Sequence, residues 1–470
     1  MAEVEAPRDV EAPGAPGAPG APGTPAPWSP ESSGPWSPQS SDTSIANKAE
    51  KNESSFSTSL LNLTKNIIGA GLLSLPLAVR DAGMIPYLLS VTLLGVLNAF
   101  TFFLLGWCSA VVGASTFGEL CAKSFSPRVA LVANLAVLLN NSMCCLAYCV
   151  LIGDFFSEAL SGLLPGCTIL HGRAENLCII GALLLVPLSL VTNLALLRYA
   201  SLAGLGVTAY VFALLLKDFV TLSDWTTSGP LLNNVAPLRP DFFKTMALIG
   251  SAFMAHYNAP KYYAQLKDRS VRKFEMLVCL AYGLAWLVFV AFGMFGFALF
   301  GFQADGNILN NYSFTPEVLV AWLSMGFSVV FTYPLVFGSF RDSSGLLLRN
   351  LFEVSEDSTQ FRVVFTCLGV AFTVLGGVAF SDVALVNGLK GAILSPCLAF
   401  IYPAAILLRT RSKCIDDKAH ESQALSSRLW RLCCYGLLTF GIAFGAMALL
   451  VMFLCKTDFS ALTAAYPAHI

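Results

Sequence analysis

The chain has 470 residues, of which 56% are hydrophobic and only 12% are charged. An average soluble domain carries about 25% charged residues, and the mean hydropathy of +0.68 points in the same direction. The formal net charge of −1 gives no basic excess, which a nucleic-acid-binding protein needs. The composition therefore excludes a soluble enzyme, a protein that binds nucleic acid and a disordered chain. It predicts a protein that crosses the lipid bilayer many times.

Segment 1–55 differs from the rest of the chain. Its first 40 residues contain 10 of the 24 prolines, and the sequence stays polar to about Glu53. Such a segment cannot bury enough apolar surface to offset its ordering entropy, so we predict a disordered Pro/Gly/Ala-rich cytosolic tail. We expect no signal peptide, because no basic stretch followed by an apolar stretch lies near Met1.

The remainder contains apolar segments long enough to be transmembrane helices, which need about 20 residues each. Their apolar runs are continuous rather than alternating, which favours helices over a barrel. The predicted fold class is an all-α integral membrane protein with eleven transmembrane helices. These segments are 57–80, 84–109, 129–160, 177–192, 200–221, 241–260, 275–302, 315–339, 363–381, 384–408 and 432–456.

The basic residues predict the orientation of these helices. With a cytosolic N-terminus, 20 of the 28 Lys and Arg residues fall in inner segments and five in outer ones. The positive-inside rule therefore places the N-terminus in the cytosol and the C-terminus outside. Three lysines remain within spans, namely Lys65, Lys217 and Lys390.

Two covalent features are predicted on the outer side. The sequon Asn311-Tyr312-Ser313 lies between the seventh and eighth spans, so we predict glycosylation of Asn311. Cys167 and Cys178 flank another outer loop. They are a candidate disulfide pair, with two free thiols as the alternative.

The first span contains a predicted break. Gly69 and Gly71 flank Ala70 near its middle, and a glycine costs a helix interior about 1 kcal/mol. A break frees backbone N–H and C=O groups, which a bilayer tolerates only where they line a cavity. The alternative is a small-residue face that packs closely on another helix.

The sixth span contains a second predicted break, at His256, Asn258 and Pro260. Spans one and six are five apart, and paired interrupted helices in two halves of a chain indicate a transporter site between inverted repeats. Half-helix N-termini attract a carboxylate, and unwound carbonyls can hold a cation or an amine. The predicted regions are two five-helix repeats (56–221 and 241–408), an outer loop (222–240), a cytosolic loop (409–431) and an eleventh helix with an outer C-terminus (432–470).

At these residues the sequence resembles the amino acid/auxin permease family. The first-helix signature reads Asn62-Leu63-x-x-x-Ile67-Ile68-Gly69-Ala70-Gly71-Leu72-Leu73-x-Leu75-Pro76, and further marks are Gly153-Asp154, Ala252-Phe253, Leu266-Lys267-Asp268 and Thr332-Tyr333-Pro334. The resemblance covers about 56–456 and is greatest to sodium-coupled neutral amino acid transporters. The run from Leu75 to Gly83 is similar to the proton-coupled branch. The resemblance implies a LeuT-type 5+5 inverted repeat plus one extra helix.

The resemblance also implies the function and the site. It implies a secondary active transporter that carries a small neutral amino acid together with Na⁺ or H⁺ by alternating access. The residues expected to bind the substrate are Gly69, Ala70, Gly71, Phe253, His256, Tyr257 and Asn258. The residues expected at the ion site are Ile67, Ile68, Ser328, Thr332 and Lys65, with Na⁺ held at Ile68, Ser328 and Thr332.

Lys65 leaves the coupling ion open, because sodium-coupled members often carry Asn at this position. A lysine beside a cation site can replace the ion by its own charge, or it can extend to the cytosolic surface. The hydroxyls of Ser324, Ser328 and Thr332 share one helix face and keep sodium as an alternative, unless they bond to their own helix. His256 is a candidate proton relay, or it satisfies freed backbone groups.

The sequence also bears on two other functional classes, a sensing receptor and an enzyme. An amino-acid-sensing receptor on the same fold is the alternative function, with the tail as a docking segment. An enzyme is not expected, because the four histidines lack the spacing of a metal site and no nucleophile motif occurs. We expect no catalytic residue and no cofactor besides the transported ion, and the sequence names no partner protein. The expected location is the plasma membrane or an acidic organelle such as a vacuole or lysosome.

Overall fold

The computed structural model describes residues 53–166, 171–191, 195–221, 234–235, 241–352, 359–416 and 424–454. The predicted N-terminal tail lies almost entirely outside these residues. The described part is built of helices, and its only β-type pairing is one isolated bridge between Ser54 and Leu266. This confirms the all-α membrane fold class.

Nine of the described helices are long and apolar enough to cross a membrane, and ten if one bent pair counts as a span. The bent pair is α2 (Phe56–Ile67) with α3 (Leu75–Ala82), joined by η1 (Ala70–Ser74). The other spans are α4 (Met84–Val112), α6 (Pro127–Leu163), α7–η3–α8 (Arg173–Ile180, Gly181–Leu185, Val186–Leu190), α9 (Ala195–Thr221), α13 (Val271–Phe300), α14 (Pro316–Phe352), α15 (Thr359–Ala379), α16–η8–α17 (Val383–Ser395, Pro396–Ile401, Tyr402–Asp416) and α18 (Ala424–Leu454).

The predicted sixth span is not among them. It forms two short helices, α11 (Phe242–Ala252) and α12 (Ala259–Gln265), with η5 (His256–Asn258) between them. Each is too short to cross a bilayer as a single straight helix. The count of eleven, the two-repeat division and the region boundaries therefore stay predictions.

Local sequence signals explain where several helices start and stop. The Ser126 hydroxyl accepts the Val129 N–H, and Pro127 occupies the first turn of α6, where its missing N–H costs nothing. Gly113 ends α4 in the left-handed region, with φ 68°. Some helices run further than the hydropathy predicts. For example, α14 passes the expected end at 339 and reaches Phe352, because a helix satisfies its backbone groups in water as well as in lipid.

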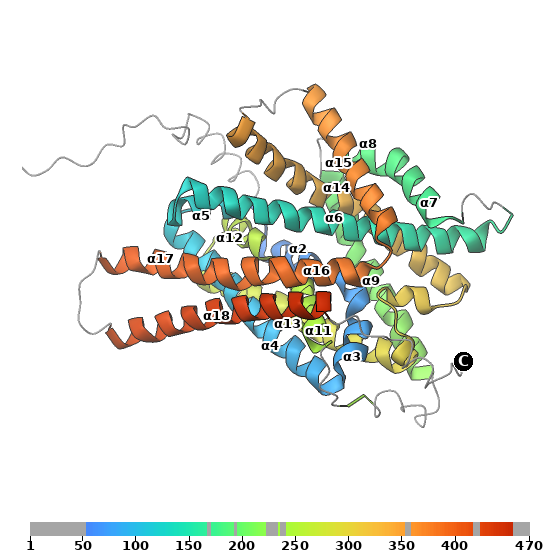
Figure 1. The fold of residues 1–470 in the computed structure, drawn as a ribbon, viewed down its shortest axis with the longest axis horizontal. Coiled ribbons are helices and arrows are strands. Elements are labelled where there is room, and N and C mark those ends of the chain that lie inside the picture. Colours follow the sequence, from blue (N-terminus) through green and yellow to red (C-terminus); the bar gives the residue numbers. More distant parts are fainter. Residues whose placement is uncertain are drawn as a thin grey trace, which may run out of the picture. The chain divides into compact units, whose positions relative to one another are not determined.

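The packing brings distant segments together. Helix α6 lies against α14, α15 and α16, while α13 lies against α3 and α4. In Figure 1, α17 and α18 run side by side, and they are in contact. An aromatic cluster around Phe102 of α4 includes Phe274 and Tyr282 of α13, at centroid distances of 5.9 and 5.5 Å. These contacts position the two breaks.

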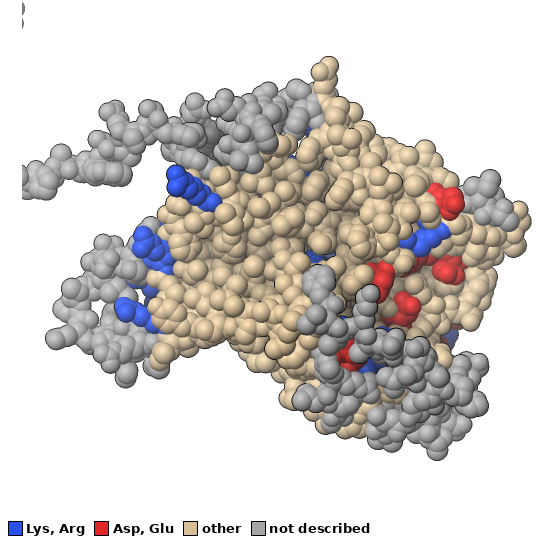
Figure 2. Space-filling model, viewed as in Figure 1, with Lys and Arg blue, Asp and Glu red and all other residues tan. Residues whose placement is uncertain are grey.

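The charged side chains are distributed unequally. Figure 2 shows Lys and Arg without visible Asp or Glu toward the end where α17 and α18 adjoin, whereas the Asp and Glu seen in this view lie toward the opposite end, together with further Lys and Arg. This asymmetry is of the kind that the positive-inside rule describes.

Candidate functional site

The first span is broken where the glycines predict. Helix α2 ends at Ile67, residues Ile68 and Gly69 leave the helical path, and the chain bends by 43° before continuing to α3. A side chain built on Gly69 would meet no atom within 4 Å. The backbone of Gly69 therefore borders open space, as expected for a break that lines a cavity.

The sixth segment is broken as well. Helix α11 ends at Ala252, residues Phe253 to Ala255 are not helical, and α12 starts at Ala259 with Pro260 in its first turn. The N–H of Met254 bonds to the carbonyl of Ser251 and not to the residue four back, so the α-helical ladder stops here.

The two breaks lie against each other. An added Cβ on Gly71 would come within 3.4 Å of the Ala252 Cα, and η1 contacts α11. An added Cβ at this distance makes ordinary van der Waals contact, so Gly71 faces packed atoms of the second break. The open space belongs to Gly69. The structure brings together the two backbone segments that were predicted to bind substrate.

The predicted substrate residues do not share one direction, however. The fully buried Phe253 packs against Phe289 and Tyr282 of α13, with centroid distances of 4.8 and 6.1 Å. The Nε2 atom of His256, also fully buried, lies 2.9 Å from the Thr101 Oγ1 and 3.1 Å from the Asn98 carbonyl of α4. Both side chains thus attach the second break to its neighbouring helices.

Tyr257 has different neighbours. Its hydroxyl interacts with Asn258 and lies within electrostatic range of Cys144 and Tyr148 of α6 and of Tyr262 of α12. The Nζ of Lys390 on α16 donates to the Cys144 Sγ at 3.6 Å. Sequence analysis identified Lys390 as a lysine within a span but gave it no role, and only the fold shows that it lies near this break.

The predicted ion site has a lysine at its centre. A Cβ built on Gly204 of α9 would lie 2.7 Å from the Lys65 Nζ and even closer to the Ser328 Oγ of α14. Three helices therefore meet here around one ammonium group, and glycine leaves the room that this group occupies. No carboxylate among the described residues pairs with Lys65 within 4.0 Å.

The other predicted ion ligands are arranged differently. Thr332 Oγ1 donates to the Ser328 carbonyl at 2.7 Å, and Ser324 Oγ donates to the Ala321 carbonyl at 3.2 Å, so both hydroxyls bond to their own helix. The side chains of Ile67 and Ile68 are buried, which leaves only their backbone carbonyls as donors of electron pairs. Of the predicted set, the structure brings Lys65 and Ser328 together.

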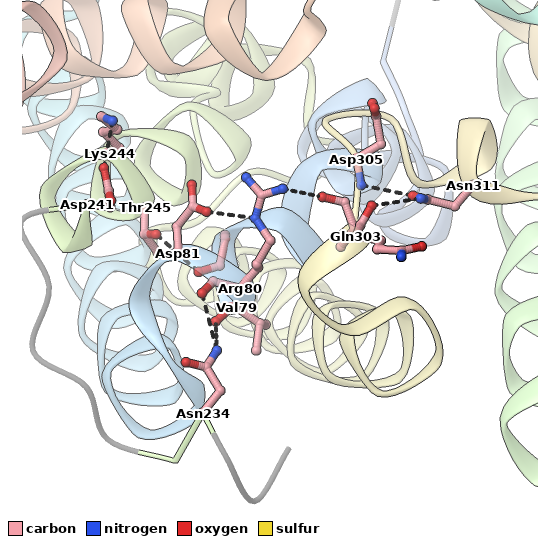
Figure 3. A network of polar contacts seen from close by, with 12 residues as sticks. Val79, Arg80, Asp81, Asn234, Asp241, Lys244, Thr245, Gln303, Asp305 and Asn311 are labelled. Carbon is pink, nitrogen blue, oxygen red and sulfur yellow. Dashed lines mark hydrogen bonds and ion pairs between the residues drawn. The ribbon is translucent and has the colours of Figure 1, made fainter. Parts of the chain in front are cut away.

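A polar network that sequence reasoning missed lies at the far end of the first break (Figure 3). Arg80 of α3 contacts the Asp81 carboxylate at 2.9 Å and the Ala304 carbonyl at 2.8 Å. Asn234 donates to the carbonyls of Val79 and Arg80, and Thr245 of α11 donates to the Ala78 carbonyl. These bonds hold the end of α3 on three other segments. Arg80 and Asp81 are neighbours in the sequence, but the bonds to the other segments join residues at least 154 apart, so no local signal could have found them.

The two predicted covalent features are not decided by the structure. Asn311 lies in η7 (Ile308–Asn311), where its Nδ2 donates to the Gln303 carbonyl and its Oδ1 accepts the Asp305 N–H (Figure 3). Cys178 is an exposed free thiol on α7, and Cys167 lies outside the described residues. Glycosylation and the disulfide therefore stay predictions.

Comparison with known proteins gives one consistent result. The model of a family described as "Transmembrane amino acid transporter protein" matches residues 52–452. Vacuolar amino acid transporter 2 of Saccharomyces cerevisiae is 25% identical over 390 residues, covering 79% of this chain and 80% of that protein. Sodium-coupled neutral amino acid transporter 7 of Xenopus laevis is 24% identical over 389 residues, covering 79% and 83%. Amino acid transporter AVT6A of Arabidopsis thaliana is 26% identical and covers 79% and 84%.

Proposed function

The chain belongs to the transmembrane amino acid transporter family, and on this premise we propose that it moves a small neutral amino acid across a membrane together with a cation. The family's function is transport and not catalysis. The match between the family and most of the chain, together with the adjoining breaks at Gly69 and Ala252, supports a substrate site at mid-membrane. In this proposal the substrate carboxylate binds the N–H groups around Gly69, Ala70 and Gly71.

The position of Lys65 supports H⁺ rather than Na⁺ as the coupling ion. A sodium site on this fold would need oxygen ligands from the first break and from α14, and the Lys65 ammonium lies beside the Ser328 hydroxyl. A sodium ion bound by Ser328 would lie close to the Lys65 ammonium, and two positive charges close together repel each other strongly in a region of low dielectric constant. The proposal is therefore that Lys65 takes the place of sodium and that its amine takes up and releases the transported proton.

Ion replacement in proteoliposomes tests this proposal. We expect uptake of a radiolabelled neutral amino acid to persist when sodium is replaced by choline. We also expect uptake to be faster when the external solution is at pH 5.5 than when it is at pH 7.4. In Lys65→Asn, uptake should lose its dependence on the proton gradient. Lys217→Asn is the matched control, because Lys217 is exposed on α9. Uptake by the unaltered protein that requires sodium would contradict the proton version.

The proposed orientation has a cytosolic N-terminus, and the charge asymmetry of Figure 2 supports it. A proton-coupled carrier fits either the plasma membrane or the membrane of an acidic organelle. The names of the yeast and frog relatives include one vacuolar and one sodium-coupled protein. Imaging a C-terminally tagged chain in cells would separate the two locations.

A further inference from the structure

A cavity of about 510 Å³ lies between the adjoining ends of α17 and α18, away from the two breaks. We name it the arginine pocket. Three of its lining residues are arginines and none is acidic, since the rest are apolar, aromatic or cysteine. The arginines are Arg409, Arg411 and Arg431, and the aromatic residues include Trp430 and Tyr435.

The arginines of this pocket have no acidic partner in the described part of the chain, where no carboxylate pairs with any of the three within 4.0 Å. The Nη1 of Arg411 is buried and makes no hydrogen bond there. A buried guanidinium donor without an acceptor costs free energy, so the pocket has donors available for an anionic ligand.

Arg411 is held in place by stacking. Its guanidinium carbon lies 5.0 Å from the centre of the Trp430 ring, and Trp430 stacks on Phe100 of α4 at 6.4 Å. Contact with an aromatic face orients the planar group without occupying its N–H donors. The site is therefore pre-organised on three helices.

The position of the pocket indicates the source of the anion. Arg409 and Arg411 end one candidate span, and Trp430 begins the next, so the pocket lies at one membrane boundary. Basic side chains gather at this end of the structure (Figure 2). Tyr435 of the pocket lining is 55% exposed, and Leu432 next to the lining residue Arg431 is 66% exposed, so both offer apolar surface to an acyl chain. Guanidinium groups match phosphate geometry, and basic pockets between spans on the cytosolic side bind anionic head groups.

We propose that the arginine pocket binds the phosphate head group of an anionic phospholipid at the predicted cytosolic face. The lipid's chains would lie along Leu432 and Tyr435, and its phosphate would supply the acceptor that Arg411 lacks. This proposal does not depend on the transported substrate or ion, because the pocket lies outside the transport site.

Native mass spectrometry of the full-length detergent-purified protein tests the proposal, with phosphatidylserine and phosphatidylcholine as the added lipids. We expect retention of phosphatidylserine and not of phosphatidylcholine. The triple variant Arg409→Gln/Arg411→Gln/Arg431→Gln should bind phosphatidylserine on the order of 100-fold more weakly, since each of the three cations near an anionic surface contributes about fivefold in affinity.

Matched controls make each outcome decisive. Arg128→Gln/Arg269→Gln/Arg272→Gln removes three exposed cations from the same predicted side and should keep the affinity. An equal loss in this control would show diffuse attraction and overturn the proposal. So would competition by millimolar inorganic phosphate alone, which would identify a soluble anion as the ligand. Because the triple variant risks misfolding, Arg411→Lys provides a second test. It keeps the charge but not the planar fork, and it should weaken binding at an unchanged thermal midpoint in phosphatidylcholine.

Discussion

At the α3 end of the first broken span, Arg80 and Asp81 form an ion pair at 2.9 Å, and Asn234 and Thr245 donate hydrogen bonds to neighbouring carbonyls of α3. At the α2 end of the same span, Lys65 lies near Gly204 and Ser328 with no carboxylate partner among the described residues. The bonds from Asn234 and Thr245 connect α3 to other segments of the fold. An unpaired charge within the membrane is costly, and such residues are often functional. The proposed function therefore assigns ion coupling to the Lys65 end, and the two ends can be compared by mutation.

The largest effect is expected at Gly204. The change Gly204→Val places atoms where the Lys65 ammonium and the Ser328 hydroxyl lie, so these groups must separate. We expect the uptake rate to fall by about tenfold or more, since overpacking of 1–3 kcal/mol corresponds to such a factor. The measurement is radiolabelled uptake in proteoliposomes.

Gly206→Val is the control for this change. It lies on the same helix, and a side chain there meets no atom within 4 Å. Its uptake should stay near that of the unaltered protein. Equal losses of uptake in the two variants would mean that α9 tolerates no valine at either position. This result would contradict a specific effect of Gly204 on the predicted ion site.

The next largest effect is expected at the paired end. Asp81→Asn removes the charge partner of the largely buried Arg80 guanidinium, and we expect a loss of about 1–3 kcal/mol in unfolding free energy. Thermal unfolding in detergent measures it. Glu317→Gln, which breaks the exposed pair with Lys217, should leave the midpoint unchanged. A midpoint for Asp81→Asn that matches this control would show that the network contributes nothing to stability.

A smaller effect is expected at His256, which is fully buried and has hydrogen-bond partners on α4. Glutamine can supply an N–H donor to the Asn98 carbonyl from a similar position. We therefore expect His256→Gln to retain most uptake and to keep the pH dependence of the unaltered protein. If instead the pH profile shifts, His256 takes part in proton transfer, and the comparison with Lys65 no longer holds.

The smallest effect is expected at Glu119, in the short helix α5 (Phe117–Ser124) between two spans. Partial burial raises the pKa of its carboxyl, but hydrogen bonds from Lys123 and the Ser115 N–H outweigh this and hold the pKa below its ordinary value. A depressed pKa stabilises the fold above the unfolded-state pKa, and the contribution is lost as the pH falls through the folded-state pKa. Glu119→Gln should cost about 0.5 kcal/mol or less at pH 7.

Thermal unfolding of Glu119→Gln and of the unaltered chain over a range of pH tests the direction in which the stabilisation by Glu119 changes with pH. The two midpoints should converge as the pH falls through the lowered folded-state pKa of Glu119, because the unaltered carboxyl then becomes protonated. A difference that persists under acid conditions would point to lost packing rather than lost charge.

Much of the fold could be predicted from the sequence because its signals are local. Apolar runs predicted the membrane fold class, and the glycines at 69 and 71 and the prolines at 76 and 260 predicted both breaks, since these residues change helix energetics wherever they occur. For the sixth segment, the residues His256, Asn258 and Pro260 predicted the break. The break leaves two helices, α11 and α12, that are each too short to count as a membrane span.

The candidate site shows the limit of local signals. Phe253, His256, Tyr257 and Asn258 lie close together in the chain and were predicted as one substrate group, yet Phe253 packs against α13 and His256 bonds to α4. Side chains that are neighbours on a short helical turn point in different directions. The helices that surround the turn decide what each one contacts.

The sequence by itself determined that this chain is a helical membrane protein of an amino acid transporter family, with two interrupted helices, because composition and backbone propensity act residue by residue. Only the tertiary structure decided that Lys65 lies against Gly204 and Ser328, and that Arg411 stacks on Trp430 in a pocket without acids. The physical reason is that the free energy of a charge within a membrane protein depends on its surroundings. For Lys65 those surroundings come from helices more than a hundred residues away in the chain, and for Arg411 they come mainly from the next helix.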